Sequence, residues 1–215
     1  EMLVEALQSL QRQTMREWVC VVTDDSDIDK LRRKNKGAVS GLGDPRIAYY
    51  AHEHAGKSKA LNDGLTHVQT ELVSILDDDD MYPPNALAVC LEYWGRKAPD
   101  GGILYGDYLT TQDFVNFQYV QSEPFNRSRL KLTDYITSLV MTTKGIAESV
   151  GGWEDVLGHN DDWDFPLKVT RKHTGIYVPE ALYIVRQHKG QKQAKRTMAA
   201  SMEEMRKRIG ENYYG

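Results

Sequence analysis

Apolar and polar positions alternate in blocks along the first hundred residues, and each block has the length of a helix or a strand. Apolar residues recur at helical spacing in several blocks, as at Leu3, Leu7 and Leu10. The predicted helices cover residues 1–12, 28–36 and 57–67, with a fourth after Pro83 and Pro84. The short apolar runs between them predict strands at residues 18–23, 46–50 and 71–76. Helices that alternate with strands are typical of an α/β sandwich built on a mostly parallel sheet.

Beyond residue 102 the pattern becomes mixed. Strands are predicted over residues 103–105, 114–120, 139–141, 176–178 and 182–185. Helices are predicted over residues 144–150, 161–172 and 194–209. Gly175 follows the second of these helices and is expected to end it. We interpret the chain as one domain, because no linker or internal repeat divides it.

The composition narrows the classes of partner and compartment. The chain has 215 residues and a formal net charge of −4, with 27 Lys and Arg against 31 Asp and Glu, which argues against a nucleic-acid partner. No apolar run approaches the ~20 residues of a membrane-spanning helix. Cys20 and Cys90 lie in apolar stretches, which favours reduced core thiols over a disulfide. We therefore expect a cytoplasmic location, which includes the cytoplasmic face of a membrane.

Four aspartates, residues 77–80, directly follow the predicted strand 71–76. Like charges at this spacing repel one another, and a divalent cation such as Mg²⁺ or Mn²⁺, which prefers oxygen ligands, removes the conflict. Asp24 follows the strand 18–23 in the same way, and ligands of open α/β sheets bind at the carboxyl ends of strands. The alternative is a solvated acidic turn that caps the helix after Pro84.

Short segments, in order over nearly the whole chain, resemble the family 2 glycosyltransferases. They include Gly-Lys-Ser-Lys-Ala-Leu-Asn at 56–62, Leu-Asp-Asp-Asp-Asp at 76–80, Asp-Asp-Trp-Asp-Phe at 161–165 and Val-Arg-Gln-His at 185–188. Further segments that resemble the family lie at residues 7–14, 21–26 and 150–153. The segment 21–26 departs from the family pattern, with Thr23 in place of Asp and Asp25 in place of Gly. The family also has a first strand, which we expect immediately before Glu1.

The resemblance implies a GT-A fold, which is a Rossmann-like three-layer α/β/α sandwich with a mostly parallel central sheet, and a nucleotide-diphosphate sugar as donor. It divides the domain into a nucleotide-binding half, an acceptor-binding half and a helical tail, at residues 1–100, 101–190 and 191–215. It also implies that Asp24 contacts the uracil or the ribose, although Asp24 equally fits the N-cap of the helix 28–36. Lys57 and Lys59 lie at a helix start that favours phosphate, or they are solvated surface lysines.

Asp77 and Asp79 are the two ends of an Asp-x-Asp motif that resembles the family's site for Mn²⁺ or Mg²⁺. The resemblance implies that Asp79 binds the cation directly and that Asp77 contacts the ribose or a cation-bound water. Asp78 belongs to the same nucleotide-binding stretch. A cation at this place stabilises the charge that develops on the leaving UDP. His188 is expected to contact the cation or a phosphate, or else is a surface histidine beside a basic stretch.

Asp162 is the predicted general base, which takes the proton of the acceptor hydroxyl as that oxygen attacks the anomeric carbon. Pro166 is expected in a first helical turn, which places residues 161–164 at the helix N-terminus. The alternative is that these aspartates serve only as N-caps. Trp163 either lines the acceptor site or belongs to the core. A base that faces a cation across one sugar implies a single displacement with inversion.

The sequence therefore predicts an inverting, metal-dependent transferase that moves a sugar from a UDP-sugar, or another nucleotide-diphosphate sugar, to an acceptor hydroxyl. The acceptor is a saccharide, a lipid-linked molecule or a protein. A sugar nucleotidyltransferase and a binding module without turnover are the alternatives. The prediction requires that the cation site at Asp77 and Asp79 shares a pocket with Asp162.

Overall fold

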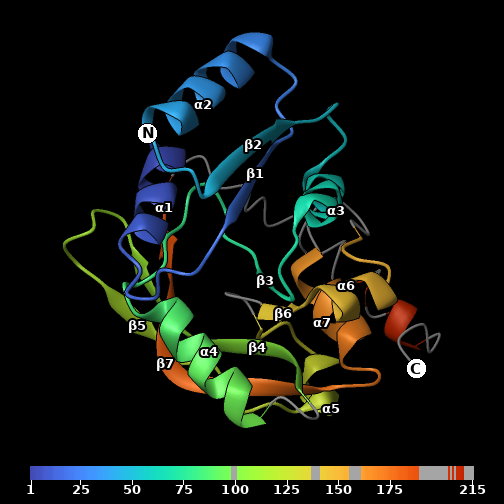
Figure 1. Ribbon diagram of the computed structural model, residues 1–215. Coiled ribbons are helices and arrows are strands. Elements are labelled where there is room, and N and C mark those ends of the chain that lie inside the picture. The colour runs from blue at the N-terminus through green and yellow to red at the C-terminus, as the bar shows by residue number, and fades with distance from the viewer. Residues whose placement is uncertain are drawn as a thin grey trace.

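The computed structural model describes residues 1–97, 101–136, 141–154, 161–188, 203, 205 and 207–210 (Figure 1). The first part of the chain alternates helix and strand, as the hydrophobic pattern predicts. Its elements are α1 (Met2–Gln11), β1 (Cys20–Asp24), α2 (Asp29–Gly41), β2 (Ile47–Ala51) and α3 (Lys57–His67). The strands β1 and β2 pair in parallel, with Cys20 opposite Ile47. The helix α1 forms because Ala6, Leu7 and Leu10 share one face, which is buried.

A second sheet contains β3 (Leu72–Ser74), β4 (Gly101–Thr111), β5 (Gln118–Val120), β6 (Met141–Thr143) and β7 (Thr174–Arg186). The strand order is β3-β6-β4-β5, and β7 pairs with β4. Most paired residues belong to the parallel ladders β1–β2 and β4–β7, whereas the antiparallel ladders β3–β6, β4–β6 and β4–β5 are short. The expectation of a mostly parallel α/β sheet is thereby confirmed.

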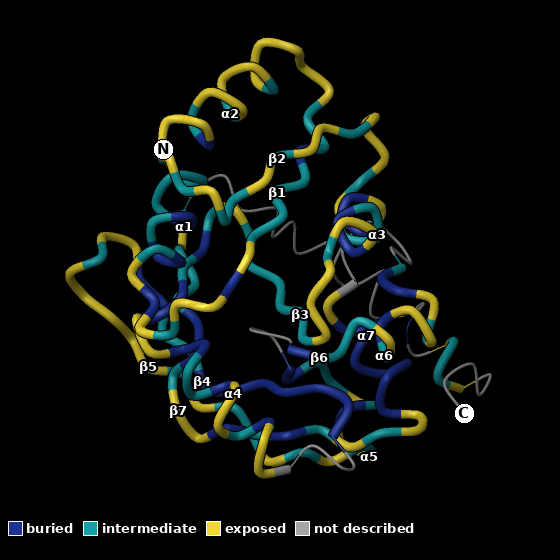
Figure 2. Tube along the Cα trace, in the orientation of Figure 1, coloured by how far each residue is buried: buried dark blue, intermediate teal, exposed yellow. Residues whose placement is uncertain are grey.

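The remaining helices are α4 (Ala86–Lys97), α5 (Arg127–Leu130), α6 (Lys144–Ser149) and α7 (Asp161–Val169). Strand β4 is buried on both faces, as Figure 2 shows, because a core lies on each side of it. Leu104 packs with Trp94 of α4 in the first core, and its neighbour Ile103 packs with Phe165 of α7 in the second. The alternation of side chains along a strand thus produces three layers, helix, sheet and helix.

Three local expectations were wrong. Pro166 lies in the second turn of α7, although Asp161–Val169 does begin with the aspartates as predicted. Gly175 lies inside β7 and does not end the helix, since the predicted strands 176–178 and 182–185 belong to one long strand. The predicted strand 114–120 is reduced to β5, because Phe114 has a φ of +56° that breaks the extended backbone.

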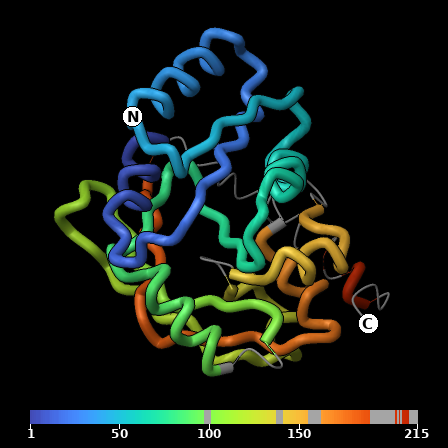
Figure 3. The backbone as a smooth tube through the Cα atoms, in the orientation of Figure 1, coloured from blue at the N-terminus to red at the C-terminus, as the bar shows by residue number. Residues whose placement is uncertain are grey.

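The fold brings the ends of distant strands to one region. In Figure 3 most of the first seventy residues (blue to cyan) lie on one side, and β4 and β7 (green and orange) lie on the other, with β3 between them.

Cys20 and Cys90 are free thiols. Within the described residues, no helix combines the length and the apolar character that a bilayer crossing requires. The predicted strand 139–141 and helix 194–209 fall largely outside the described residues.

Candidate functional site

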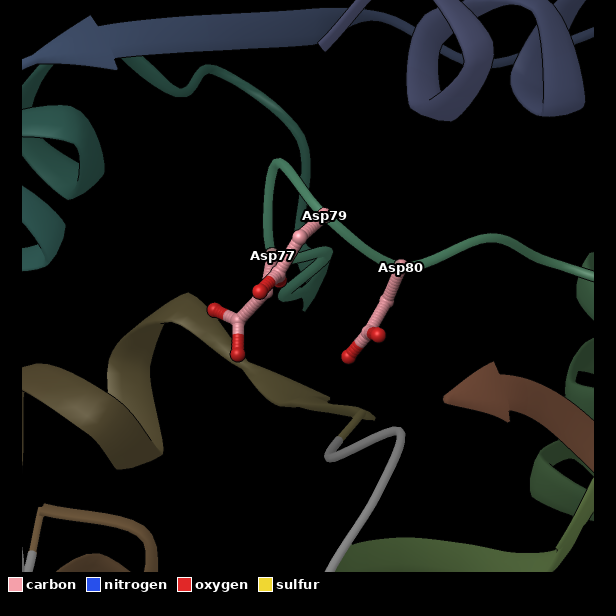
Figure 4. Close-up of side chains that lie close together, drawn as sticks. All are labelled: Asp77, Asp79 and Asp80. Carbon is pink, nitrogen blue, oxygen red and sulfur yellow. The ribbon is translucent and has the colours of Figure 1, made fainter. Parts of the chain in front are cut away.

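The acidic loop after β3 gathers three carboxylates. Asp77, Asp79 and Asp80 each offer an oxygen atom, and these atoms all lie within 4.8 Å of one another. Figure 4 shows the three side chains on the same side of the loop, with Asp77 and Asp79 close together and Asp80 beside them. A set of ligands made only of carboxylate oxygens suits a hard cation such as Mg²⁺ or Mn²⁺. The residues therefore fit the cation that the sequence predicts.

The electrostatics of this loop also favour a cation. Asp80 is buried, and desolvation raises its pKa to about 7, helped by the charges of Asp79 and Asp77 and opposed by a hydrogen bond from the Arg186 backbone. Desolvation and the charges of Asp79 and Asp77 likewise raise the pKa of Asp78. Without a cation the loop thus carries an electrostatic cost, and a bound divalent ion would remove much of it.

The end of β7 holds the acidic loop in shape. The backbone N–H of Arg186 donates to Asp80 Oδ1 at 2.9 Å, and Arg186 Nε donates to the carbonyl oxygen of Asp79 at 3.0 Å. The backbone N–H of Asp77 donates to the hydroxyl of Tyr183, also in β7, at 3.1 Å. His188 lies two residues beyond the end of β7, and its Nε2 is 3.0 Å from Asp79 Oδ2. The structure therefore brings His188 to the predicted cation ligand.

Lys57, the first residue of α3, lies between the acidic loop and α7. Its Nζ is 3.1 Å from Asp77 Oδ2 and 3.5 Å from Asp162 Oδ1. Asp162 stands in the first turn of α7, and its side chain is 55% exposed, so a molecule from solution can reach it. The predicted cation ligand Asp77 and the predicted base Asp162 therefore border the same ammonium group, and their roles stay predictions.

Asp24, at the end of β1, is buried among hydrogen-bond donors. Its oxygens accept from the Ser26 backbone N–H at 2.9 Å, from Asn35 Nδ2 at 2.9 Å and from the Tyr49 hydroxyl at 2.7 Å. Burial by itself raises the pKa of Asp24, but these hydrogen bonds outweigh it and lower the pKa below its usual value. Asp24 is not a helix cap, because the N-cap of α2 is Ile28. Its contact with a nucleotide stays a prediction.

Two predicted residues are engaged elsewhere. Lys59 pairs with Asp63 one turn along α3, so the structure does not join it to the acidic loop. Trp163 is buried in the second core, where its Nε1 donates to the carbonyl oxygen of Leu130 at 2.7 Å. Of the two alternatives that the sequence left open for Trp163, the structure selects the core, because its ring is enclosed by apolar neighbours.

Sequence reasoning gave no role to Arg186 or Asp25. Arg186 stands in a segment that resembles the family, which was a usable signal. Asp25 stood out only as a departure from glycine, and its carboxylate accepts hydrogen bonds from the backbone just before α3. Such a contact joins residues thirty positions apart, and no spacing rule reveals it.

Comparison with known proteins places this chain in a family. The model of glycosyl transferase family 2 matches residues 1–148. An uncharacterized glycosyltransferase of Rickettsia conorii is 27% identical over an alignment of 177 residues, which covers 78% of this chain and 29% of the relative. The chain therefore spans less than a third of that relative.

Solved structures share the GT-A fold with this chain. S. aureus TarS in complex with UDP-GlcNAc has a TM-score of 0.68 at 18% identity, over 88% of this chain and 56% of that one. The mannosyltransferase PcManGT from Pyrobaculum calidifontis, in complex with GDP-Man and Mn²⁺, has a TM-score of 0.66 at 19% identity, over 94% of this chain and 60% of that one. Since the family model covers more than two thirds of its residues, the chain belongs to glycosyl transferase family 2.

Proposed function

We propose that this chain transfers a sugar from a nucleotide-diphosphate sugar to an acceptor hydroxyl by a single displacement with inversion. The observation that carries the proposal is the position of Lys57, whose ammonium contacts both Asp77 and Asp162. A donor-binding corner and a proton acceptor must lie this close for an acceptor oxygen to reach the anomeric carbon of a bound donor.

The donor is held by residues at the strand ends. Asp24 and Asp78 contact the nucleoside, and Lys57 supplies positive charge to the diphosphate at the start of α3. Asp77, Asp79 and His188 hold Mn²⁺ or Mg²⁺, whose positive charge, when bound, stabilises the departing diphosphate. Relatives of the fold were solved with UDP-GlcNAc and with GDP-Man, and we favour a UDP-sugar for this chain.

Asp162 carries out the proton transfer. One of its carboxylate oxygens accepts the hydroxyl proton of the acceptor while the acceptor oxygen forms its bond to the anomeric carbon. The bond between that carbon and the diphosphate oxygen breaks, and its electron pair leaves with the nucleoside diphosphate. Attack opposite the leaving group inverts the anomeric configuration. The acceptor is a saccharide, a lipid-linked molecule or a protein.

The variant Asp162→Asn tests this assignment in the full-length protein. UDP release from a panel of UDP-sugars with Mn²⁺ and candidate acceptors should fall by roughly 10²–10⁴-fold, because a general base contributes about that much. Binding of UDP, measured by calorimetry, should be retained. Asp29→Asn is the matched control, since Asp29 is an exposed carboxylate in the first turn of α2.

Other results would select an alternative. UDP binding without turnover of any donor, in the parent protein, would favour a binding module. Pyrophosphate release from UTP and a sugar 1-phosphate would favour a nucleotidyltransferase. If Asp162→Asn kept full transferase activity, the role of Asp162 as base would have to be abandoned.

A further inference from the structure

The carboxylate of Asp25 accepts hydrogen bonds from the backbone immediately before α3. Its Oδ1 accepts from the N–H of Ala55 at 2.8 Å, and its Oδ2 accepts from the N–H of Gly56 at 2.9 Å. The side chain of Asp25 is only 19% exposed, so these two hydrogen bonds are partly shielded from water. Two bonds to successive N–H groups fix the direction of the chain as well as its position.

Ala55 and Gly56, which donate these hydrogen bonds, belong to a turn that sets where α3 begins. Gly56 has a φ of +93°, a conformation that side chains other than glycine rarely adopt, and it is the N-cap of α3. The neighbouring His54 also reaches Asp25, with Nδ1 2.6 Å from the Asp25 carbonyl oxygen. The loop after β1 and the loop before α3 are therefore tied together at several points.

The turn leads directly to Lys57. The ammonium of Lys57 then lies 3.1 Å from Asp77 Oδ2 and 3.5 Å from Asp162 Oδ1. A lysine side chain has many rotamers, and one on a loosely held backbone would spend much of its time away from both carboxylates. Holding the turn at Ala55 and Gly56 narrows the positions that Lys57 can reach.

We infer that Asp25 is a positioning residue, which fixes the turn before α3 so that Lys57 spans Asp77 and Asp162. The inference rests on the proposed function, in which Lys57 meets the donor diphosphate. The segment 21–26 resembles a family motif that has glycine at the place of Asp25, and glycine has no carboxylate to offer. Asp25 acts through Lys57 and has no contact with the reacting atoms.

Nucleotide binding tests the inference by separating the diphosphate from the nucleoside. In calorimetry with Mn²⁺, Asp25→Ala should weaken UDP binding by roughly tenfold, about one charge-assisted contact, and leave uridine binding unchanged. The UDP affinity of Asp25→Asn should lie between those of the parent and Asp25→Ala, since its amide oxygen still accepts one N–H. The double variant Asp25→Ala with Lys57→Ala should bind UDP no more weakly than Lys57→Ala alone. Asp27→Asn, in the same loop and exposed, is the matched control.

Chemical labelling gives a second readout that needs no nucleotide. Reductive methylation of the Lys57 amine, followed by mass spectrometry, should be faster in Asp25→Ala and Asp25→Asn than in the parent, and unchanged in Asp27→Asn. If the parent fails to bind UDP while this labelling pattern holds, the proposed function fails and the positioning role stands.

Three results would overturn the inference. The first is an equal loss of uridine and UDP affinity in Asp25→Ala, which would place Asp25 in the nucleoside pocket. The second is a double variant whose loss of UDP affinity equals the sum of the losses in Asp25→Ala and Lys57→Ala. The third is unchanged labelling of Lys57 in a folded Asp25→Asn protein. Circular dichroism checks folding, and Asp25→Asn serves if Asp25→Ala does not fold.

Discussion

Asn62 holds the turn that leads from α6 toward α7. Its Nδ2 donates to the carbonyl oxygen of Trp153 at 2.8 Å, and its Oδ1 accepts from the Trp153 N–H at 2.9 Å. Trp153 in turn stacks on Phe165 of α7, with ring centroids 4.4 Å apart. Gly152 has a φ of +70°, and a Cβ there would overlap Oδ1 of Asn62. One side chain thus connects α3 to the helix that carries Asp162.

We expect Gly152→Ala to lower the free energy of unfolding by roughly 1–3 kcal/mol, because it adds both backbone strain and an overlap with Asn62. Urea denaturation measures the change. Gly145→Ala is the control, since Gly145 lies in α6 with open space around its Cβ position, and alanine there should stabilise by up to about 1 kcal/mol. Equal stability of Gly152→Ala and the parent would show that Asn62 moves aside freely.

The elements differ in how far their sequences predict them. The helix predicted at 57–67 has the same bounds as α3, because its apolar face repeats at helical spacing and Gly56 marks its start. The strand predicted at 114–120 forms only over its last residues, as β5. Val115 and Phe117 alternate with polar residues, yet they are exposed on a turn that Asp113 caps. Periodicity records which residues are apolar but not whether a partner covers them.

The candidate site divides in the same way. The acidic loop and His188 could be predicted, because short segments that resemble a family mark them. The contact between Lys57 and Asp162 joins residues more than a hundred positions apart, and the grip of Asp25 on the turn before α3 depends on the paths of two loops. Both are tertiary contacts, which no local pattern encodes.

Asp24 joins three elements at the end of β1, and its titration should appear in the acid stability of the protein. Its neighbours in this network are Asn35 of α2 and Tyr49 of β2. The pKa of Asp24 is lowered in the folded state, so its ionised form stabilises the fold. This contribution is fully present above the unfolded pKa near 4 and is lost as the pH falls through the lower folded pKa.

We expect Asp24→Asn to be less stable than the parent at pH 7, by roughly 1–3 kcal/mol, because the new amide group faces donors. The difference should shrink as the pH falls below about 4, because Asp24 is then protonated in the unfolded chain and, at still lower pH, in the folded protein as well. Urea midpoints at pH 7 and pH 3 measure it, and exposed Asp27→Asn is the control. A difference that stays constant over this range would contradict a lowered pKa.

The molecule as a whole is built on two cores that share β4, and the C-terminal part of the chain contributes to one of them. Met205 is fully buried in the second core together with Trp163, Phe165 and Leu167 of α7. A second contact is the ion pair of Arg208 with Glu154, at 3.5 Å. The helix that presents Asp162 thus depends on a segment far along the chain for part of its packing.

Replacing Met205 by alanine removes a buried side chain from this shared core. We expect the free energy of unfolding to fall by roughly 2–4 kcal/mol, since the cavity adds to the lost burial. Exposed Leu132→Ala, at 67% exposure, is the control and should stay within about 0.5 kcal/mol of the parent. UDP affinity of folded Met205→Ala should be unchanged, because the donor residues belong to the strand ends and α3. A stability loss as small as that of Leu132→Ala would mean that the C-terminal segment does not pack on α7 in solution, and Asp162 would then rest on the remaining core alone.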